Sequence, residues 1–367
     1  MLKQYKLANY KFILIIMVIA INTIGVLLVE SARPALMDKQ LLGMISGIML
    51  MIFISLIDYR FVLKFSWAIY VAMIGLLIAV KLFGKSTGGA QRWIDLKFMQ
   101  FQPSELAKIL IILFFAYYFM KNEEKITTVK VLFSSFALVG IPLVLIVTQP
   151  DLSTTITTAV VFISMLFVAG ISYKLVASVL IVCVPTFIIL FTLLVQDKLP
   201  FLKGYQVARV MAWLYPEEYP DIAYQQQNSI MAIGSGQLWG KGLNNTDATS
   251  VKNGKFILEP QTDFIFAVAG EELGFIGTLT IILLLLFIAI ECIFIARKAK
   301  DTAGKLICCG MAALVGFQSA INICVTSGLL PNTGLPLPFV SYGLTSLWSL
   351  YIGMGFVLNV GLQAKKH

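Results

Sequence analysis

The chain has 367 residues, of which 59% are hydrophobic and only 13% are charged. Soluble domains are roughly one half apolar and one quarter charged, so this composition excludes a water-soluble globular protein. The net charge of +9 comes largely from short loops between apolar runs and gives no reason to expect a nucleic-acid partner. The only histidine is His367, so a general base has to be a carboxylate, a lysine or a tyrosine.

Ten apolar runs approach the length of a bilayer-spanning helix, about 20 mostly apolar residues. In chain order they are Phe12–Val29, Leu41–Ile57, Trp67–Phe83, Ser104–Met120, Val131–Thr148, Leu152–Gly170, Leu175–Val195, Leu273–Ala296, Leu306–Leu330 and Tyr342–Leu362. The first run follows lysines as a signal peptide does, but it is longer than a cleavable core and is expected to remain as an anchor. The sequence therefore predicts an all-α integral membrane protein of about ten transmembrane helices, forming one polytopic domain over residues 1–367.

The loop charges predict the orientation of these helices. Ten spans put both termini on one side, and 15 of the 28 Lys and Arg residues lie on that side, all in short segments. Positive charge in short loops favours the cytoplasm, so both termini are expected to be cytoplasmic, in the cytoplasmic membrane of a bacterium.

Two segments on the opposite side are too long to be turns, and long loops in compact proteins commonly carry function. One is Gly84–Pro103, and the other is the large extracytoplasmic loop 196–263 between the seventh and eighth helices. The second contains the glycine-rich run Ala232–Gly242, which is not the highly charged composition of disorder. We expect it to form a folded cap with short amphipathic helices.

Proline marks the start of several inward-running helices on this outer side. Gln102-Pro-Ser-Glu105 opens the fourth span and Gln149-Pro-Asp151 opens the sixth, while Glu259-Pro-Gln-Thr-Asp263 and Pro338-Phe-Val-Ser-Tyr-Gly343 precede the eighth and tenth. Proline suits a first helical turn, because the N–H that it lacks would be unpaired there. Helix N-termini that converge in one vestibule would form a site for phosphate groups.

Four acidic and basic side chains in these segments have two interpretations each. Asp151 and Asp263 are either functional carboxylates or simple helix caps, with about equal weight. Glu105 and Lys108 lie three residues apart on one helix face, so they form either a functional pair beside a wet cavity or a structural ion pair. Arg92 and Trp93, in Gly88-Gly-Ala-Gln-Arg-Trp93, are residue types that also commonly anchor helices at the membrane interface.

In combination, these segments resemble the SEDS family of peptidoglycan glycosyltransferases (RodA, FtsW and SpoVE), and the RodA branch most. The resemblance covers nearly the whole chain. It rests on Gly89–Asp95, Phe101–Lys108, Gln149–Leu152, Ala232–Gly242, Thr262–Phe266, Gly270–Gly274, and Asn322 through Gly328–Pro331 to Ser341-Tyr-Gly343. So many motifs in the same order make a chance match untenable.

The resemblance implies an enzyme that polymerises lipid II on the outer face of the membrane, for cell elongation and shape, together with a class B penicillin-binding protein. It implies that Asp263 is the catalytic carboxylate and that Trp93, Glu105 and Lys108 are important for function. Three positions depart from the family pattern. Pro260 stands one place later than the usual proline, Ser153 replaces a glycine, and Leu344 replaces the second glycine of Ser-Tyr-Gly-Gly.

The chemistry of such a reaction suggests roles for the remaining candidates. Release of a lipid pyrophosphate needs a base for the attacking hydroxyl and positive charge for the leaving group, with inversion at the anomeric carbon. We expect Asp263 to be the base, and Arg92, Arg209 and the helix N-termini to bind the pyrophosphate. Asp151 and Ser341 are further expected substrate-binding residues. A divalent cation, Mg²⁺ or Mn²⁺, held by carboxylate and phosphate oxygens also suits this chemistry.

A second function from another class is a lipid II flippase, because many spans and charges within the membrane also suit transport. Transporters often contain internal repeats and helices broken near the midplane of the bilayer. The sequence has no evident repeat, and its polar motifs gather on one side. These two features favour the enzyme over the flippase, and over a scaffold without activity.

Overall fold

The computed structural model describes residues 10–87, 90–95, 99–172, 177, 181, 185, 189, 192–193, 204–245, 250, 254 and 256–364. Within these ranges, eight helices are long and apolar enough to cross a membrane. They are α1 (Phe12–Ala32), α2 (Met37–Ser55, preceded by the 3₁₀ turn η3, Pro34–Leu36), α4 (Ser66–Phe83), α5 (Pro103–Lys121), α6 (Val129–Thr148), α11 (Ile265–Arg297), α12 (Thr302–Thr326) and α13 (Leu344–Leu362). The protein is thus an all-α, multi-pass membrane protein.

Two further parts of the expected bundle differ from these eight. The sixth expected span is the 17-residue apolar helix α7 (Leu152–Val168). The seventh, Leu175–Val195, lies almost entirely outside the described residues, so the total of ten stays a prediction. Short helices α3 (Tyr59–Leu63) and η4 (Glu123–Lys125) connect spans at one end of the bundle.

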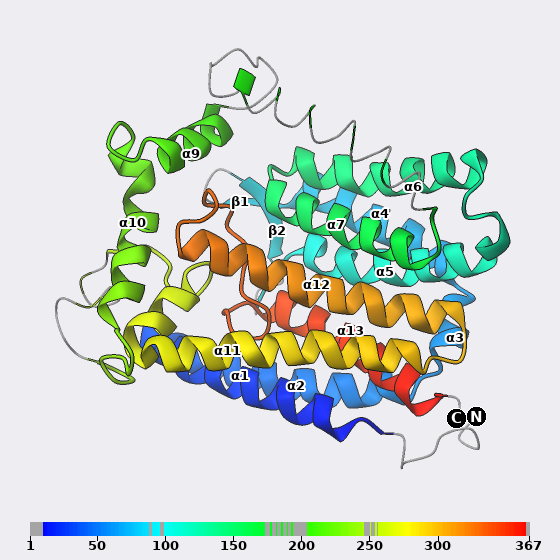
Figure 1. The fold of residues 1–367 in the computed structure, drawn as a ribbon, viewed down its shortest axis with the longest axis horizontal. Helices are drawn as coiled ribbons and strands as arrows, with labels where there is room; N and C mark the ends of the chain where they lie inside the picture. Colours follow the sequence, from blue (N-terminus) through cyan, green and yellow to red (C-terminus); the bar gives the residue numbers. More distant parts are fainter. Residues whose placement is uncertain are drawn as a thin grey trace.

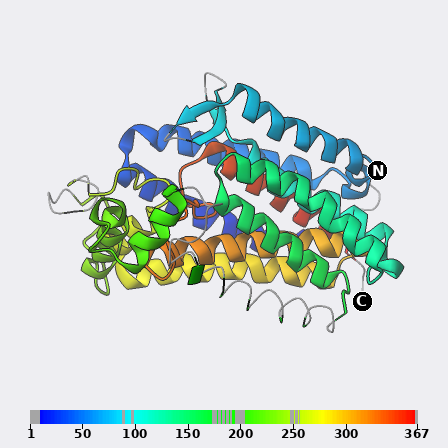
Figure 2. The same cartoon turned by 90° about the horizontal axis from the view of Figure 1, so that it is seen from above.

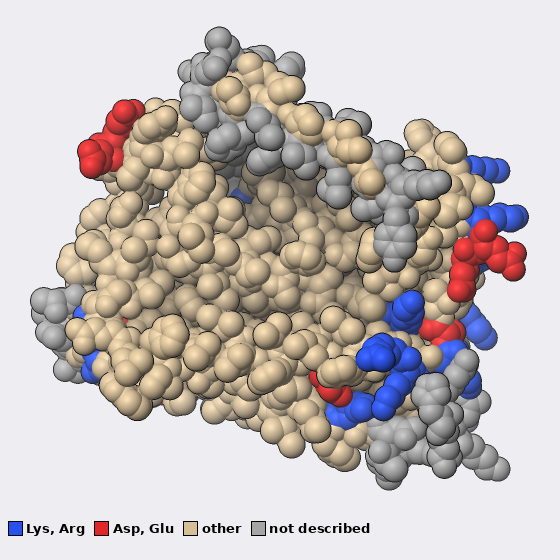
Figure 3. Space-filling model, in the orientation of Figure 1, with Lys and Arg blue, Asp and Glu red and all other residues tan. Residues whose placement is uncertain are grey.

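The spanning helices run side by side along the long axis of the molecule (Figure 1). Figures 1 and 2 place α9 (Gly204–Leu214) and α10 (Pro220–Ser235) together at one end, whereas α1 begins and α13 ends at the other. On the face drawn in Figure 3, charged side chains gather toward the two ends, and the broad middle is uncharged. This is the distribution that a bilayer around the middle of the bundle requires.

Helix α5 lies at the centre of the bundle. Together with α13 it is the most buried of the eight spans, whereas α2 and α4 are the least buried. Large apolar side chains on peripheral helices, such as Phe53, Val71 and Phe133, are more than half exposed, as side chains that face lipid are. Glu105 and Lys108 of α5 are therefore enclosed by protein.

A small antiparallel sheet, which the sequence did not indicate, connects α4 to α5. Its strands are β1 (Lys85–Thr87), β2 (Ala90–Asp95) and β3 (Gln100–Phe101), in the order β1-β2-β3. Ile94 pairs with Phe101 across β2 and β3. The sheet matters because β2 carries Arg92 and Trp93, and backbone pairing on both sides fixes where these side chains project.

The large loop contains short helices, as expected, and its glycine-rich part packs against the start of α11. The N–H groups of Lys241 and Gly242 donate to the carbonyls of Glu271 and Glu272, at 2.9 and 3.0 Å. Gly240 has φ +80°, and a Cβ atom there would lie 2.2 Å from the Glu272 carbonyl oxygen. The two backbones can approach so closely because glycine stands at this point of the contact.

Several helix starts differ from the predictions. Helix α11 begins at Ile265 rather than near Leu273, and Gly274 (φ 64°, ψ −162°) interrupts it with a kink. Helix α13 begins at Leu344, so Pro338 precedes it by six residues instead of opening it. Of the four motif prolines, only Pro103 stands in a first helical turn. The others lie in the segments ahead of their helices.

Candidate active site

A cavity of about 640 Å³ lies where the N-terminal ends of α5, α7 and α13 meet the loop before α11. Six of the eight predicted site residues line it, and they come from five separate segments of the chain. These six are Arg92, Trp93, Glu105, Asp151, Arg209 and Asp263. Lys108 and Ser341 lie behind the wall instead. The predicted convergence of helix N-termini is thus confirmed for α5, α7 and α13.

Asp263 is carried by a loop that the rest of the protein holds in place through its backbone. The Asn322 amide donates to the Asp263 carbonyl at 2.8 Å, and the Ser341 hydroxyl donates to the Thr262 carbonyl at 2.6 Å. The Tyr342 N–H also donates to the Gln261 carbonyl at 2.9 Å. Ser341 therefore positions this loop and is not exposed in the cavity. None of these bonds involves the Asp263 carboxylate, so the loop is held in place without it.

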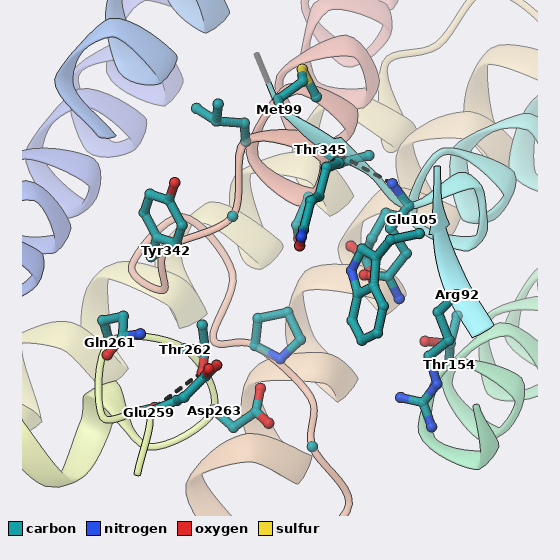
Figure 4. Close-up of a pocket in the computed structure, with 18 of the residues that line it drawn as sticks. Arg92, Met99, Glu105, Thr154, Glu259, Gln261, Thr262, Asp263, Tyr342 and Thr345 are labelled. Carbon is teal, nitrogen blue, oxygen red and sulfur yellow. Dashed lines mark hydrogen bonds between the residues drawn. The ribbon is translucent and has the colours of Figure 1, made fainter. Parts of the chain in front are cut away.

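The pKa of Asp263 is raised from 3.8 to about 6. Burial by the surrounding protein is the largest cause, because it disfavours the ionised form. The Arg209 and Arg92 guanidinium groups lower the pKa, while the Glu259 and Asp151 carboxylates raise it. The side chain is partly exposed, and in Figure 4 its carboxylate points into the space between the 259–263 loop and Arg92. It is an accessible carboxylate with unusual basicity.

The wall opposite Asp263 holds Arg92 in a fixed position. Its guanidinium donates to the carbonyls of Gln149 and Pro150 and lies 3.9 Å from the Asp151 carboxylate. Asp151 in turn caps α7, because it accepts from the Thr154 N–H at 3.2 Å, and it also accepts from the Gln102 amide. Asp151 is therefore a helix cap, but it is not only a cap, because the same carboxylate also orients Arg92.

Glu105 and Lys108 form a deeply buried ion pair below the cavity. The Lys108 ammonium lies 2.9 Å from the Glu105 carboxylate and also donates to the Gln318 amide oxygen at 2.8 Å. Gln318 then donates to the Pro336 carbonyl at 2.9 Å. The pair thus connects α5 to α12 and to the loop before α13. Only Glu105 reaches the cavity, so Lys108 acts through its neighbours.

Sequence reasoning missed two cations on a third wall of the cavity. Arg33, after α1, and Lys39, in the first turns of α2, both line it. Only their position on the outer side could have suggested them, because the short connection between the first two spans contains no motif. With Arg92 and Arg209 they give the cavity four cationic side chains, which come from more than one wall.

The three departures from the family pattern all lie at or beside this cavity. Leu344 lines it and packs over Gly43 of α2, where a Cβ atom would lie 2.5 Å from the leucine side chain. The Ser153 hydroxyl donates to the Thr333 carbonyl, so it replaces the glycine without entering the cavity. Pro260 lies between Glu259 and Asp263, and both of these carboxylates still face the cavity.

The cavity offers carboxylates for a divalent cation, but no complete set of protein ligands among the described residues. Within the ranges that the structure describes, no three His, Cys, Asp or Glu side chains form a cluster that could hold a metal. Asp263 and Glu259 nevertheless line the same cavity close enough for Glu259 to raise the pKa of Asp263. Mg²⁺ commonly uses one or two carboxylates together with substrate phosphates, and this pair supplies that number.

Comparison with known proteins places the chain in a family. Residues 3–366 match the family model FtsW/RodA/SpoVE, described as cell cycle protein. The chain belongs to this family. It is 35% identical over 358 residues to the peptidoglycan glycosyltransferase MrdB of Escherichia coli K12, covering 96% of this chain and 93% of that one. It is 32% identical to the probable peptidoglycan glycosyltransferase FtsW of Trichlorobacter lovleyi, with 99% and 96% covered.

Solved structures share the fold of this family member. One, described as showing structural coordination of polymerization and crosslinking by a peptidoglycan synthase complex, has a TM-score of 0.77 at 28% identity and covers 96% of this chain and 97% of that one. The rod shape determining protein RodA of Thermus thermophilus has a TM-score of 0.69 at 25% identity, with 98% of each chain covered. The similarity extends over the whole bundle, including the segments that form the cavity.

Proposed function

We propose that this protein is a peptidoglycan glycosyltransferase that polymerises lipid II into glycan strands, for cell elongation and shape. The observation that carries the proposal is Asp263, a partly exposed carboxylate with a pKa near 6 that shares one cavity with Arg92 and Arg209. A base and fixed cations are the groups that transfer of a sugar from a lipid pyrophosphate requires. Relatives named as peptidoglycan glycosyltransferases, similar over nearly the whole chain, support the proposal.

In the reaction, the 4-hydroxyl of one lipid-linked sugar attacks the anomeric carbon of the growing chain. The new C–O bond forms as the bond from that carbon to the pyrophosphate breaks, and the configuration inverts from α to β. Asp263 takes the proton of the attacking hydroxyl, and undecaprenyl pyrophosphate leaves. A carboxylate with a pKa of about 6 is mostly ionised at neutral pH and is still a stronger base than an ordinary aspartate.

The cations of the cavity stabilise the negative charge that develops on the departing pyrophosphate. Arg92 is held by two carbonyls and Asp151, so it needs no rearrangement during the reaction. Both reactants carry a pyrophosphate, and Arg33 and Lys39 supply positive charge on a wall away from Arg92. The cavity thus has charge for a donor and for an acceptor.

A divalent cation, Mg²⁺ or Mn²⁺, would be held by Glu259 and phosphate oxygens. When bound, it would supply additional neutralisation of the pyrophosphate charge. Arg92, Arg209 and the N-terminus of α5 provide positive charge there in any case.

The proposed cellular arrangement is based on the distribution of charge in the loops. With both termini in the cytoplasm, the cavity faces the outer side of the cytoplasmic membrane, where lipid II is polymerised. A class B penicillin-binding protein is the proposed partner, and similarity to a chain of a peptidoglycan synthase complex supports it.

A lipid II flippase would need a polar route through the bundle, and among the described residues the part of the bundle below the cavity is packed with apolar side chains. Below Lys108, Ile109 of α5 and Met311 of α12 pack against Gly353, and Ile112 of α5 packs against Gly310. The polar side chains of the cavity remain at one end.

Incubation of the purified protein with lipid II tests the proposal, with and without its penicillin-binding protein, by separation of glycan strands according to length. Strands should form, and they should disappear with Asp263→Asn. Movement of lipid II across proteoliposomes without polymerisation, in the presence of the partner, would instead favour the flippase.

A further inference from the structure

A second cavity lies at the opposite end of the bundle, where α1 begins and α11 ends. Its volume is about 440 Å³, and its lining consists of Lys11, Glu291, Phe294, Arg297 and Lys298. None of these residues takes part in the proposed reaction. Figure 3 shows Lys and Arg side chains gathered on this end of the molecule.

The charge balance of this cavity favours an anion. Three cationic side chains against one carboxylate, Glu291, leave a net charge of +2. Lys11 lies 3.7 Å from Glu291, longer than a hydrogen bond between charged groups. Within the described part of the chain, Arg297 and Lys298 form no ion pair within 4.0 Å. Positive charge in a cytoplasmic loop explains the signs of these residues, but it does not explain why they surround a hollow.

The cavity is continuous with a surface that faces lipid. Phe294 lines the cavity and is 48% exposed. Phe287 stands seven residues, two helical turns, before Phe294 on the same face of α11 and is also about half exposed. At the start of α1, Phe12 and Ile13 are exposed as well. A molecule with its anionic part in the cavity would therefore have an apolar surface beside it for hydrocarbon chains.

We propose that this cavity binds the phosphate headgroup of an anionic phospholipid from the leaflet at this end of the protein. Basic pockets between transmembrane helices on the cytoplasmic side are suited to such headgroups. The net charge of +2 favours phosphatidylglycerol or the two-phosphate lipid cardiolipin over zwitterionic lipids. The apolar flank at Phe294 favours a lipid over free phosphate, which would use only the cations.

The test uses the purified full-length protein and native mass spectrometry of bound lipid. The wild type should bind phosphatidylglycerol and cardiolipin in preference to phosphatidylcholine. In Arg297→Gln/Lys298→Gln the affinity should fall roughly 30-fold, from about 1 kcal/mol for each cation near the surface and tenfold in affinity for each 1.4 kcal/mol. In Glu291→Gln the affinity should rise roughly fivefold, because a competing negative charge is removed.

Lys121→Gln/Lys125→Gln is the matched control, because it removes two exposed cations at the same end of the bundle without touching the cavity. Melting curves in phosphatidylcholine verify that all variants fold. An equal loss of lipid in the control, equal binding of phosphatidylcholine by the wild type, or weaker binding by Glu291→Gln would overturn the proposal. Complete displacement of the lipid by millimolar inorganic phosphate would assign the site to free phosphate and would also overturn it.

Discussion

Replacement of Asp263 by asparagine separates catalysis from stability, because the structure predicts opposite effects on the two. The carboxylate is not the cap of α11, whose N-cap residue is Phe264 and has no side-chain cap. The loop that carries Asp263 is held through its backbone groups. Asparagine has nearly the same size, so the loop should keep its position. If Asp263 is the general base, polymerisation should fall by about 10²–10⁴-fold.

The same substitution should not destabilise the protein at neutral pH. An acid whose pKa rises from 3.8 to about 6 on folding binds its proton more tightly in the folded state, so its ionisation opposes folding. The cost is absent below pH 3.8, grows between pH 3.8 and 6, and is complete above pH 6. It amounts to at most about 3 kcal/mol, at about 1.4 kcal/mol per pH unit, and to less where water in the cavity screens the charge. Asp263→Asn should therefore melt at the same or a higher temperature than the wild type at pH 7.

The assay is glycan-strand formation from lipid II, with a penicillin-binding protein whose own chemistry is limited to transpeptidation. The wild-type rate should rise with pH through about 6 as Asp263 loses its proton, and melting temperatures should be measured in the same buffers. Near-normal polymerisation by Asp263→Asn would refute the assignment of the base. A lost activity accompanied by a lower melting temperature at pH 7 would refute the structural part of the reasoning.

Three further predictions concern the ion pair, the glycine contact and the orientation. Glu105→Ala and Lys108→Ala should each destabilise the protein by about 3–5 kcal/mol, because each leaves a buried charge unpaired. In a double-mutant cycle the combined loss should be much smaller than the sum, and strict additivity would contradict the pairing. Gly240→Ala should lower stability by more than about 1–2 kcal/mol, since it combines a left-handed φ with a clash, whereas Gly234→Ala in open space on α10 should be neutral or stabilising by about 0.5–1 kcal/mol in thermal melts. A cysteine at Glu217, in a variant without native cysteines, should react with an impermeant thiol reagent in intact cells, whereas one at the C-terminus should not. Reversed labelling would overturn the orientation.

Local properties of the sequence determined the class of the fold and most of the spans. Runs of apolar residues long enough to cross a bilayer can satisfy their backbone groups only as helices, so α1, α5 and α6 lie where the composition predicted them. The motif residues were also identifiable, because a charge such as Lys108 within an apolar run is costly and has to be enclosed. The number of spans stays a prediction, since the seventh lies outside the described residues.

What only the tertiary structure decided is which side chains face the cavity and which stand behind it. Ser341 and Lys108 belong to sequence motifs just as Asp263 and Glu105 do, yet they lie behind the wall. Ser341 acts through the carbonyl of Thr262, and Lys108 acts through the side-chain amide of Gln318. Arg33 belongs to no motif and nevertheless lines the cavity, because helix packing brings the end of α1 close to the loop before α11. The pKa of Asp263 likewise depends on groups from β2, from α9 and from the N-cap of α7, which are distant along the chain. Sequence periodicity records only local burial, whereas these roles arise from contacts between segments that become neighbours when the helices pack.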